Sequence, residues 1–151
     1  GVGTVKGLAA GVDKPVAGVS SLEALAYNVP FFDGIISPIL DARKSQVYNS
    51  LYKWEKGVLK QLAPMRAIAI SDLLSELPDG ALFLGDGVLP YRDTITGVLG
   101  AAARFAPAHL LYQRASSVAA AAMHFKGVPA RELVPHYIRR SQAETDADAG
   151  K

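Results

Sequence analysis

The sequence of 151 residues contains no cysteine. This absence excludes a disulfide scaffold, a zinc site built on thiolates and a cysteine nucleophile, and it fits a reducing compartment. A charge excess is also missing, because 16 basic and 14 acidic residues leave a formal net charge of +2. Such a chain has no strong field to attract nucleic acid or an anionic membrane.

Long apolar runs are missing as well. No stretch approaches the roughly 20 apolar residues that span a bilayer. The first residues lack the charged region and long apolar stretch of a signal peptide. We therefore expect a soluble cytoplasmic protein. Half of the residues are apolar and 20% are charged, which is ordinary for a globular protein with one sizeable core.

The first stretch, "GVGTVKGLAAGV", predicts a helix over residues 2–12, with apolar residues at helical spacing. Gly3, Gly7 and Gly11 recur every four residues and form a stripe of small residues that lets another helix approach closely. Each glycine costs a helix about 1 kcal/mol relative to alanine. We interpret this as a helix that packs against a partner.

The next stretches predict alternating elements. "KPVAGVS" is typical of a short buried strand, and Ser20 or Ser21 is expected to cap a helix that runs through Tyr27. "IISPIL" predicts a strand in which Pro38 favours an edge position or a bulge. "DARKS" predicts a hairpin connection to a second strand, "QVYNSLYKW".

The second half predicts three helices and a strand. "SDLLSEL" indicates a capped helix ended by Pro78, and "ALFLGDG" a buried strand that runs into a glycine turn. A helix from Pro90 to Gly100 is expected to turn its apolar side chains inward, namely Tyr91, Ile95, Val98 and Leu99. "SSVAAAAMHFKG" predicts a helix with a serine cap and Gly127 just after its end. The mixture of elements indicates an α/β or α+β core.

The three histidines do not form a recognisable metal motif. His109, His124 and His136 are never four residues apart, so no helix shows a two-histidine pattern. We expect no metal site. No G-x-S-x-G motif is present, and no set of nucleophile, base and oxyanion hole can be assembled from the sequence.

Two short motifs could carry chemistry or only shape turns. Gly85, Asp86 and Gly87 follow a predicted strand, where backbone amides could approach a phosphate. A tight turn explains them better, because no P-loop lysine and serine lie nearby. Asp41 could act as a base or metal ligand beside Arg43 and Lys44. We favour a role in ordering the hairpin, because no second carboxylate is close in sequence.

A basic aromatic segment, "HYIRR", lies near the end of the chain. His136, Tyr137, Arg139 and Arg140 could contact RNA by stacking and by binding phosphate. One short patch on a nearly neutral chain is weak evidence for such contact. Docking of Tyr137 and Ile138 onto the protein explains it better.

Several stretches together resemble the TsaB (YeaZ) family. "GVGTVKGLAAGVDKPVAGVSSLEALA" resembles the segment that follows the family's G-P-G-S-F-T-G-L-R-I motif, and "PILDARKSQVYNSLY" resembles its strand–turn–strand. "GDGVLPY" and "ELVPHYIRR" resemble its later motifs. These markers stand in the family's order over residues 1 to about 141. An older label for the family is glycoprotease-like or peptidase-like.

The resemblance implies a fold and a domain division. The family has the two-domain actin/Hsp70/sugar-kinase architecture, in which each half is built on a ribonuclease-H-like core. The chain then looks like a C-terminal fragment of a longer protein. Residues 1–30 would be the end of the first domain, 34–141 the second domain, and 142–151, small and acidic, a disordered tail.

The resemblance also implies a function. The family helps to make N6-threonylcarbamoyladenosine at position 37 of tRNA. TsaD carries the metal and transfers the carbamoyl group, and TsaE is an ATPase partner. TsaB lacks the metal-binding histidines and acts as a scaffold for TsaD, so no catalytic residue and no cofactor are implied here. Contact with TsaE and tRNA would be indirect, through the TsaD complex.

The family pairs, with itself as a homodimer or with TsaD, mainly through long helices of the first domain. The candidate contact residues on the first helix are Val2, Gly3, Lys6, Gly7 and Ala10. The alternative is that this stripe packs only against strands of the longer protein. For the whole chain, the alternative function is a nucleotide-binding or peptidase-like enzyme of the same fold.

Overall fold

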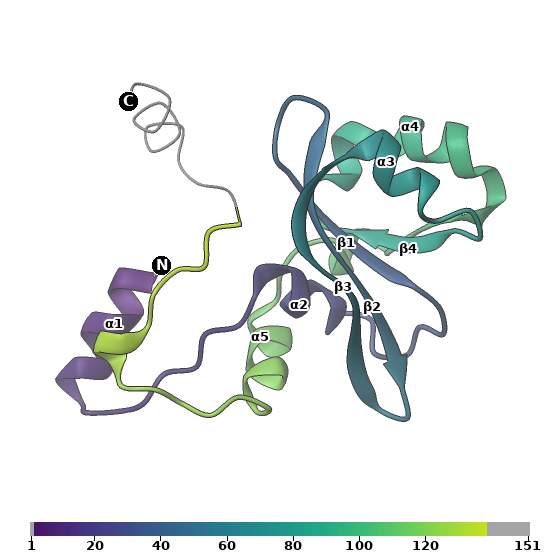
Figure 1. Cartoon of the computed structure of the whole chain (residues 1–151). Coiled ribbons are helices and arrows are strands. Elements are labelled where there is room, and N and C mark those ends of the chain that lie inside the picture. Colours follow the sequence, from purple (N-terminus) through teal and green to yellow (C-terminus); the bar gives the residue numbers. More distant parts are fainter. Residues whose placement is uncertain (1, 139–151) are drawn as a thin grey trace, which may run out of the picture.

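The computed structural model describes residues 2–138. Its centre is one five-stranded sheet with the strand order β3-β2-β1-β4-β5 (Figure 1). The strands β1, β2 and β3 form an antiparallel meander, and β4 and β5 continue the sheet parallel to β1. The strands are β1 (Ile36–Asp41), β2 (Gln46–Glu55), β3 (Val58–Ala69), β4 (Ala81–Leu84) and β5 (Ala103–Phe105).

Helices cover both faces of this sheet. Helices α2 (Ser21–Ala26) and α5 (Ala115–Ala122) lie on one face, and α3 (Ile70–Ser75) and α4 (Val88–Leu99) lie on the other (Figure 1). Short 3₁₀ turns η1 (Gly100–Ala102), η2 (Ala108–Leu110) and η3 (Ala130–Glu132) connect or follow them. Covered on both sides, β1 and β4 are almost entirely buried, which explains their continuous apolar sequences.

The main core lies between the sheet and the helices α2, α3 and α4. Because the apolar residues of α2 and α3 recur at helical spacing, each helix presents a complete apolar face to the sheet. The largest fully buried side chains are Phe83, Leu22, Leu25, Ile36, Ile39, Leu73, Leu74, Leu77, Leu84, Ile95, Val29 and Val47.

The predicted edge position of Pro38 is wrong, because β1 lies between β2 and β4. The residues of β1 that pair with β2 skip from Ile36 to Ile39. At that gap the side-chain amide of Asn49 donates hydrogen bonds to the carbonyl oxygen of Pro38 (2.9 Å) and the hydroxyl of Ser37 (3.0 Å). The same amide also donates to the carbonyl oxygen of Ser50 (3.2 Å), so a side-chain donor stands in the part of the ladder where the proline has no N–H to donate.

Other elements differ from the sequence expectations. "KPVAGVS" forms no strand, since only Val16 pairs, in a single bridge with Val128. Helices α3 and α5 begin without a side-chain cap, and α5 ends at Ala122, before Gly127. In α4, Ile95 is fully buried as expected, but Val98 is 62% exposed. Strands β3 and β5 were not predicted.

Helix α1 (Val2–Gly11) stands apart from the sheet, beside η3 (Figure 1). It belongs to a second, small apolar cluster made by Ala9, Val16 and Ala130, with Val128 and Leu133 packed against it. By contrast, the buried residues of α2 belong to the main core. The proposed domain boundary at residues 30–34 stays a prediction.

Two further expectations concern the ends and the membrane. No helix in residues 2–138 is long and apolar enough to cross a bilayer. The predicted tail 142–151, and Arg139 and Arg140 of the basic segment, lie outside the described residues.

Candidate functional site

The surface of α1 is open over most of its circumference. Ala9 is its one buried residue. Apolar side chains remain at its surface, with Leu8 70%, Val5 49% and Val2 39% exposed, and Val12, directly after the helix, is 66% exposed. An apolar helix surface of this kind is typical of a contact with another element.

The glycine stripe is open as well. A Cβ atom added at Gly3, Gly7 or Gly11 would meet nothing within 4 Å. Within residues 2–138, therefore, no element makes the close approach that these glycines permit. Of the five candidate contact residues, Val2, Gly3, Gly7 and Ala10 are exposed.

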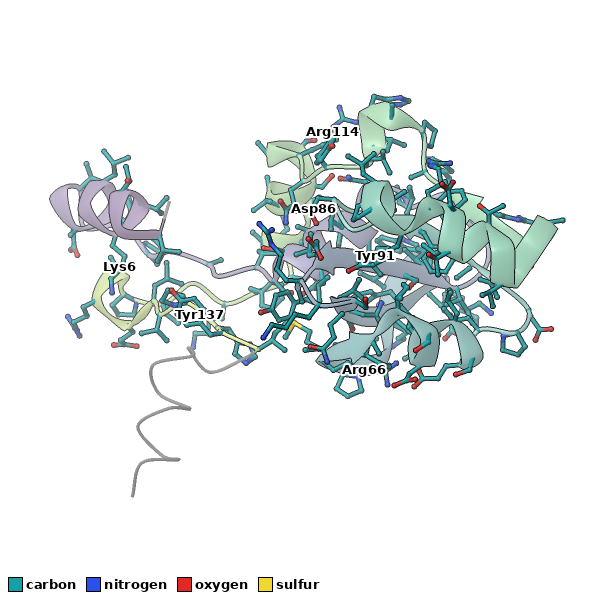
Figure 2. All side chains as sticks on the ribbon, turned by 90° about the horizontal axis from the view of Figure 1, so that it is seen from above. Lys6, Arg66, Asp86, Tyr91, Arg114 and Tyr137 are labelled. Atoms are coloured by element: carbon teal, nitrogen blue, oxygen red, sulfur yellow. The ribbon has the colours of Figure 1, made fainter. Side chains whose placement is uncertain are left out.

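Lys6, the fifth candidate, has a different role. Its ammonium group donates hydrogen bonds to the carbonyl oxygens of Leu133 (2.8 Å) and Arg131 (3.3 Å), at the end of η3. Figure 2 shows Lys6 between α1 and the segment that contains η3. The charge therefore joins two segments far apart in the sequence, and it holds α1 in place rather than offering a free contact.

We expect Lys6→Met to loosen α1 without unfolding the main core. Methionine keeps an unbranched apolar stem and removes both hydrogen bonds, each worth about 1 kcal/mol. Hydrogen–deuterium exchange should accelerate about tenfold or more in α1 and η3 and stay unchanged in β1 and β4. Equal acceleration in β1 would show that α1 is part of the main cooperative unit.

The two turn motifs meet at one edge of the sheet. Strands β1 and β4 are parallel neighbours, so their carboxyl ends bring Asp41 and Asp86 together. A carboxylate oxygen of Asp86 accepts a hydrogen bond from the backbone amide of Asp41 (3.0 Å). Gly85 and Gly87 lie close to the carbonyl oxygen of Ile39.

The side chain of Asp41 is also occupied within the protein. Its Oδ1 accepts hydrogen bonds from the amide of Arg43 (2.9 Å) and the hydroxyl of Tyr91 (3.3 Å). Burial, together with the negative charge of Asp41, raises the pKa of Tyr91. The connection continues through Arg43, Lys44 and Ser45, all three with positive φ. These contacts support the structural interpretation of both motifs, as turns fixed by carboxylates.

The three histidines lie in three different environments. His109 is in η2, the ring of His124 lies 6.2 Å from that of Tyr27, and His136 lines a cavity near α1. In the described part of the chain, no three histidine, aspartate or glutamate side chains are grouped so that they could hold a metal ion.

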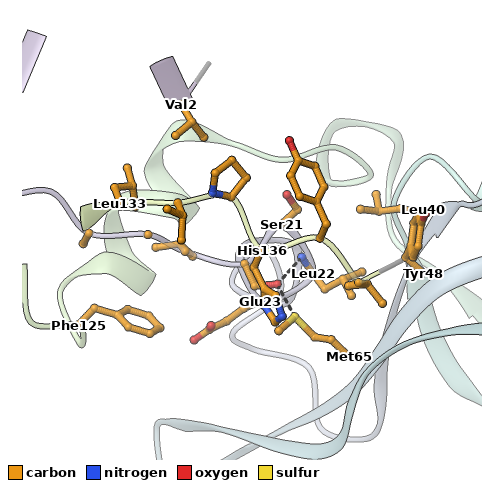
Figure 3. Close-up of a pocket in the computed structure, with 18 of the residues that line it drawn as sticks. Val2, Ser21, Leu22, Glu23, Leu40, Tyr48, Met65, Phe125, Leu133 and His136 are labelled. Atoms are coloured by element: carbon orange, nitrogen blue, oxygen red, sulfur yellow. Dashed lines mark hydrogen bonds between the residues drawn. The ribbon is translucent and has the colours of Figure 1, made fainter. Parts of the chain in front are cut away.

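The cavity beside α1 has a volume of about 830 Å³ (Figure 3). Its walls are mainly apolar and come from α1, α2, the sheet and residues 133–138. Burial raises the pKa of Glu23 in its wall, partly offset by the positive charge of His124. Ile138 packs on the main core as expected, but Tyr137 is 79% exposed, so its predicted docking is wrong. Sequence reasoning missed this cavity, because its lining comes from distant segments.

The five-stranded mixed sheet with helices on both faces is an α/β fold, and it is consistent with the ribonuclease-H-like core that the sequence predicts. Comparisons with known proteins agree. A family model described as "TsaD: tRNA N6-adenosine threonylcarbamoyltransferase" matches residues 1–147. The tRNA threonylcarbamoyladenosine biosynthesis protein TsaB of Bacillus subtilis is 38% identical over 147 residues, which is 95% of this chain and 64% of that protein.

Solved structures show the same fold. YeaZ from Pseudomonas aeruginosa has a TM-score of 0.67 at 21% identity, over 90% of this chain and 65% of YeaZ. A second structure is described as an uncharacterized protein with similarity to peptidase YeaZ from P. aeruginosa. It has a TM-score of 0.68 at 21% identity, over 91% of this chain and 65% of that protein. The chain therefore belongs to the family whose model is described as the tRNA N6-adenosine threonylcarbamoyltransferase TsaD. It spans about 64% of the length of the curated relative.

Proposed function

We propose that this chain takes part in the biosynthesis of threonylcarbamoyladenosine in tRNA, as a non-catalytic partner of a TsaD-type protein. The observation that carries the proposal is its 38% identity to a protein named for that biosynthesis. TsaE would be reached through the TsaD complex, and contact with tRNA would be indirect. The competing assembly is a homodimer in which two copies of the chain pair through the surface of α1.

The geometry of α1 supports a contact between proteins. Its apolar side chains are exposed, and its glycine stripe has nothing within 4 Å of an added Cβ. Small residues on a helix surface let the backbone of a second helix approach closely. We therefore place the partner on the face of α1 that carries Gly3, Gly7 and Ala10, with Val2 at its margin.

The test is a calorimetric titration of the chain into TsaD from the same organism. We expect saturable one-to-one binding and no turnover by the chain alone. The same titration with the longer TsaB of B. subtilis and its own TsaD shows whether the additional segment is needed. Absence of binding in both pairs would contradict the scaffold proposal. Hydrolysis of a peptide or nucleotide that is lost in Asp41→Ala or Asp86→Ala would favour an enzyme instead.

Substitution of Gly7 by leucine tests the place of the contact. The side chain of Gly7→Leu has open space in the free chain, so the fold should persist, and it would block close approach of a partner helix. We expect binding to TsaD to weaken about 5- to 150-fold, since overpacking a tight interface costs about 1–3 kcal/mol.

A matched control for this substitution lies in α4. Gly97 is also helical and also has nothing within 4 Å of an added Cβ. Gly97→Leu should leave TsaD binding unchanged. If both variants bind TsaD as tightly as the unaltered chain, the glycine face of α1 is not the interface.

A further inference from the structure

A second concave surface lies away from α1 and from the Asp41–Asp86 edge. It is an open cavity of about 600 Å³. Three segments form its walls: Pro30 and Phe31 after α2, the turn around η2, and the first half of α5. This volume falls within the range of pockets that hold small molecules.

Phe31 gives this pocket an aromatic face. The side chain is 75% exposed although the main core lies directly beside it, where Val29 is 1% exposed. A phenylalanine ring in water is less favourable than a buried one. An exposed ring at the wall of a pocket is suited to stacking against a planar ligand such as a nucleobase.

The charge of the pocket is positive. Arg114 and His109 contribute to its lining, and none of the described residues that line it is acidic. The guanidinium of Arg114 has no ion-pair partner within residues 2–138. Figure 2 shows Arg114 on the side of the molecule where α5 begins. A guanidinium with unused donors is well suited to binding the oxygens of a phosphate.

Hydrogen bonds of a buried asparagine connect the segments at the base of the pocket. The amide of Asn28 donates hydrogen bonds to the carbonyl oxygens of Leu110 and Tyr112, both at 2.8 Å. Its carbonyl oxygen accepts one from the hydroxyl of Ser117 (2.6 Å). Asn28 is 6% exposed, so this network joins the three walls from beneath. A preformed pocket spends less free energy on ordering when it binds.

We propose that this pocket binds a nucleotide unit, with the base stacked on Phe31 and the phosphate held by Arg114, assisted by His109. The ring of Phe31 suits the base, and the guanidinium of Arg114 suits the phosphate. Among the described residues, the lining has no carboxylate that would repel the phosphate. The unit comes from a free nucleotide or from a single-stranded RNA. The pocket is separate from α1. An experiment can therefore contradict nucleotide binding and leave the proposed TsaD contact intact, or contradict the TsaD contact and leave nucleotide binding intact.

The test is a titration of the isotopically labelled chain with AMP, followed by amide resonances in NMR spectra. We expect the amide resonances of Phe31, His109, Arg114 and Ser116 to shift as AMP is added. Adenosine alone and inorganic phosphate alone should cause smaller shifts of the same resonances. Phe31→Ala and Arg114→Ala should each weaken AMP binding about tenfold. Both residues are at the surface, so the rest of the spectrum should keep its dispersion.

Two matched controls separate the pocket from general surface effects. Tyr137→Ala removes an aromatic ring that is 79% exposed elsewhere, and Arg43→Ala removes a guanidinium whose side chain is 90% exposed. Both should bind AMP unchanged. Absence of shifts at millimolar AMP, or equal weakening in the controls, would overturn the proposal.

A short single-stranded RNA distinguishes the two sources of the ligand. If an adenine oligonucleotide binds much more tightly than AMP, with the same dependence on Phe31 and Arg114, the site contacts a strand. If the oligonucleotide binds no more tightly than AMP, the ligand is a free nucleotide. RNA binding that ignores both substitutions would overturn the proposal.

Discussion

Replacing Gly85 with alanine is expected to lower the free energy of unfolding by at least about 3 kcal/mol. Gly85 has a φ of +106°, and an added Cβ would lie 2.1 Å from the carbonyl oxygen of Ile39. The amide of Gly85 also donates a hydrogen bond to the carbonyl oxygen of Leu111 (2.8 Å), so the turn cannot move aside freely. Urea unfolding followed by circular dichroism measures the loss.

The matched control for this prediction is Gly57→Ala in the turn between β2 and β3. Gly57 also has a positive φ, +77°, but an added Cβ meets nothing within 4 Å. Gly57→Ala therefore carries only the cost of placing an alanine in the left-handed backbone conformation, which is about 1 kcal/mol. The difference between the two variants therefore isolates the close approach of β1 and the turn after β4. Equal losses in both would show that this turn relaxes at little cost.

Replacing Asn28 with alanine is expected to cost about 3 kcal/mol of folding free energy. The variant removes three hydrogen bonds of the buried side chain, each worth about 1 kcal/mol, and leaves the hydroxyl of Ser117 without its acceptor. Thermal unfolding and chemical denaturation should agree on the loss. Ser117→Ala should cost only about 1 kcal/mol, because one hydrogen bond disappears.

The charge variant Asn28→Asp tests whether donation to the two carbonyls matters. Aspartate has nearly the same shape but no amide to donate, so a carboxylate would face the carbonyl oxygens of Leu110 and Tyr112. Its pKa should be raised in the folded state, so stability should increase as the pH falls and the carboxyl becomes a donor. A pH-independent loss equal to that of Asn28→Ala would contradict this account.

Much of the fold could be predicted from local patterns. Helical spacing located α1, α2 and α4, and the β-branched and apolar runs located β1, β2 and β4. β3 could not be found in this way, because it is an edge strand with exposed residues and Pro64 in its middle, so its sequence shows no clean alternation. β5 has three residues and depends on pairing with β4.

For the candidate sites as well, single residues could be found in the sequence, but contacts between distant residues could not. Asp41 and Asp86 could be noticed separately, but their contact depends on the parallel pairing of β1 with β4, which no local pattern reveals. The stripe of Gly3 and Gly7 was visible in the sequence, whereas the hydrogen bonds of Lys6 to distant carbonyls were not. The pocket with Phe31 is lined by segments that are remote in the sequence and that the hydrogen bonds of Asn28 join.

The attachment of α1 has a consequence for the order in which the protein acquires its structure during translation. The carbonyls that receive the ammonium of Lys6 lie 125 and 127 residues further along the chain. At roughly 5–20 residues per second, α1 leaves the ribosome about 6 to 25 s before these carbonyls are synthesised. For that time Ala9, the buried residue of α1, lacks Ala130, with which it shares an apolar cluster in the folded chain. A nascent chain is thus a natural client for a chaperone, or for a protein that binds the same helix.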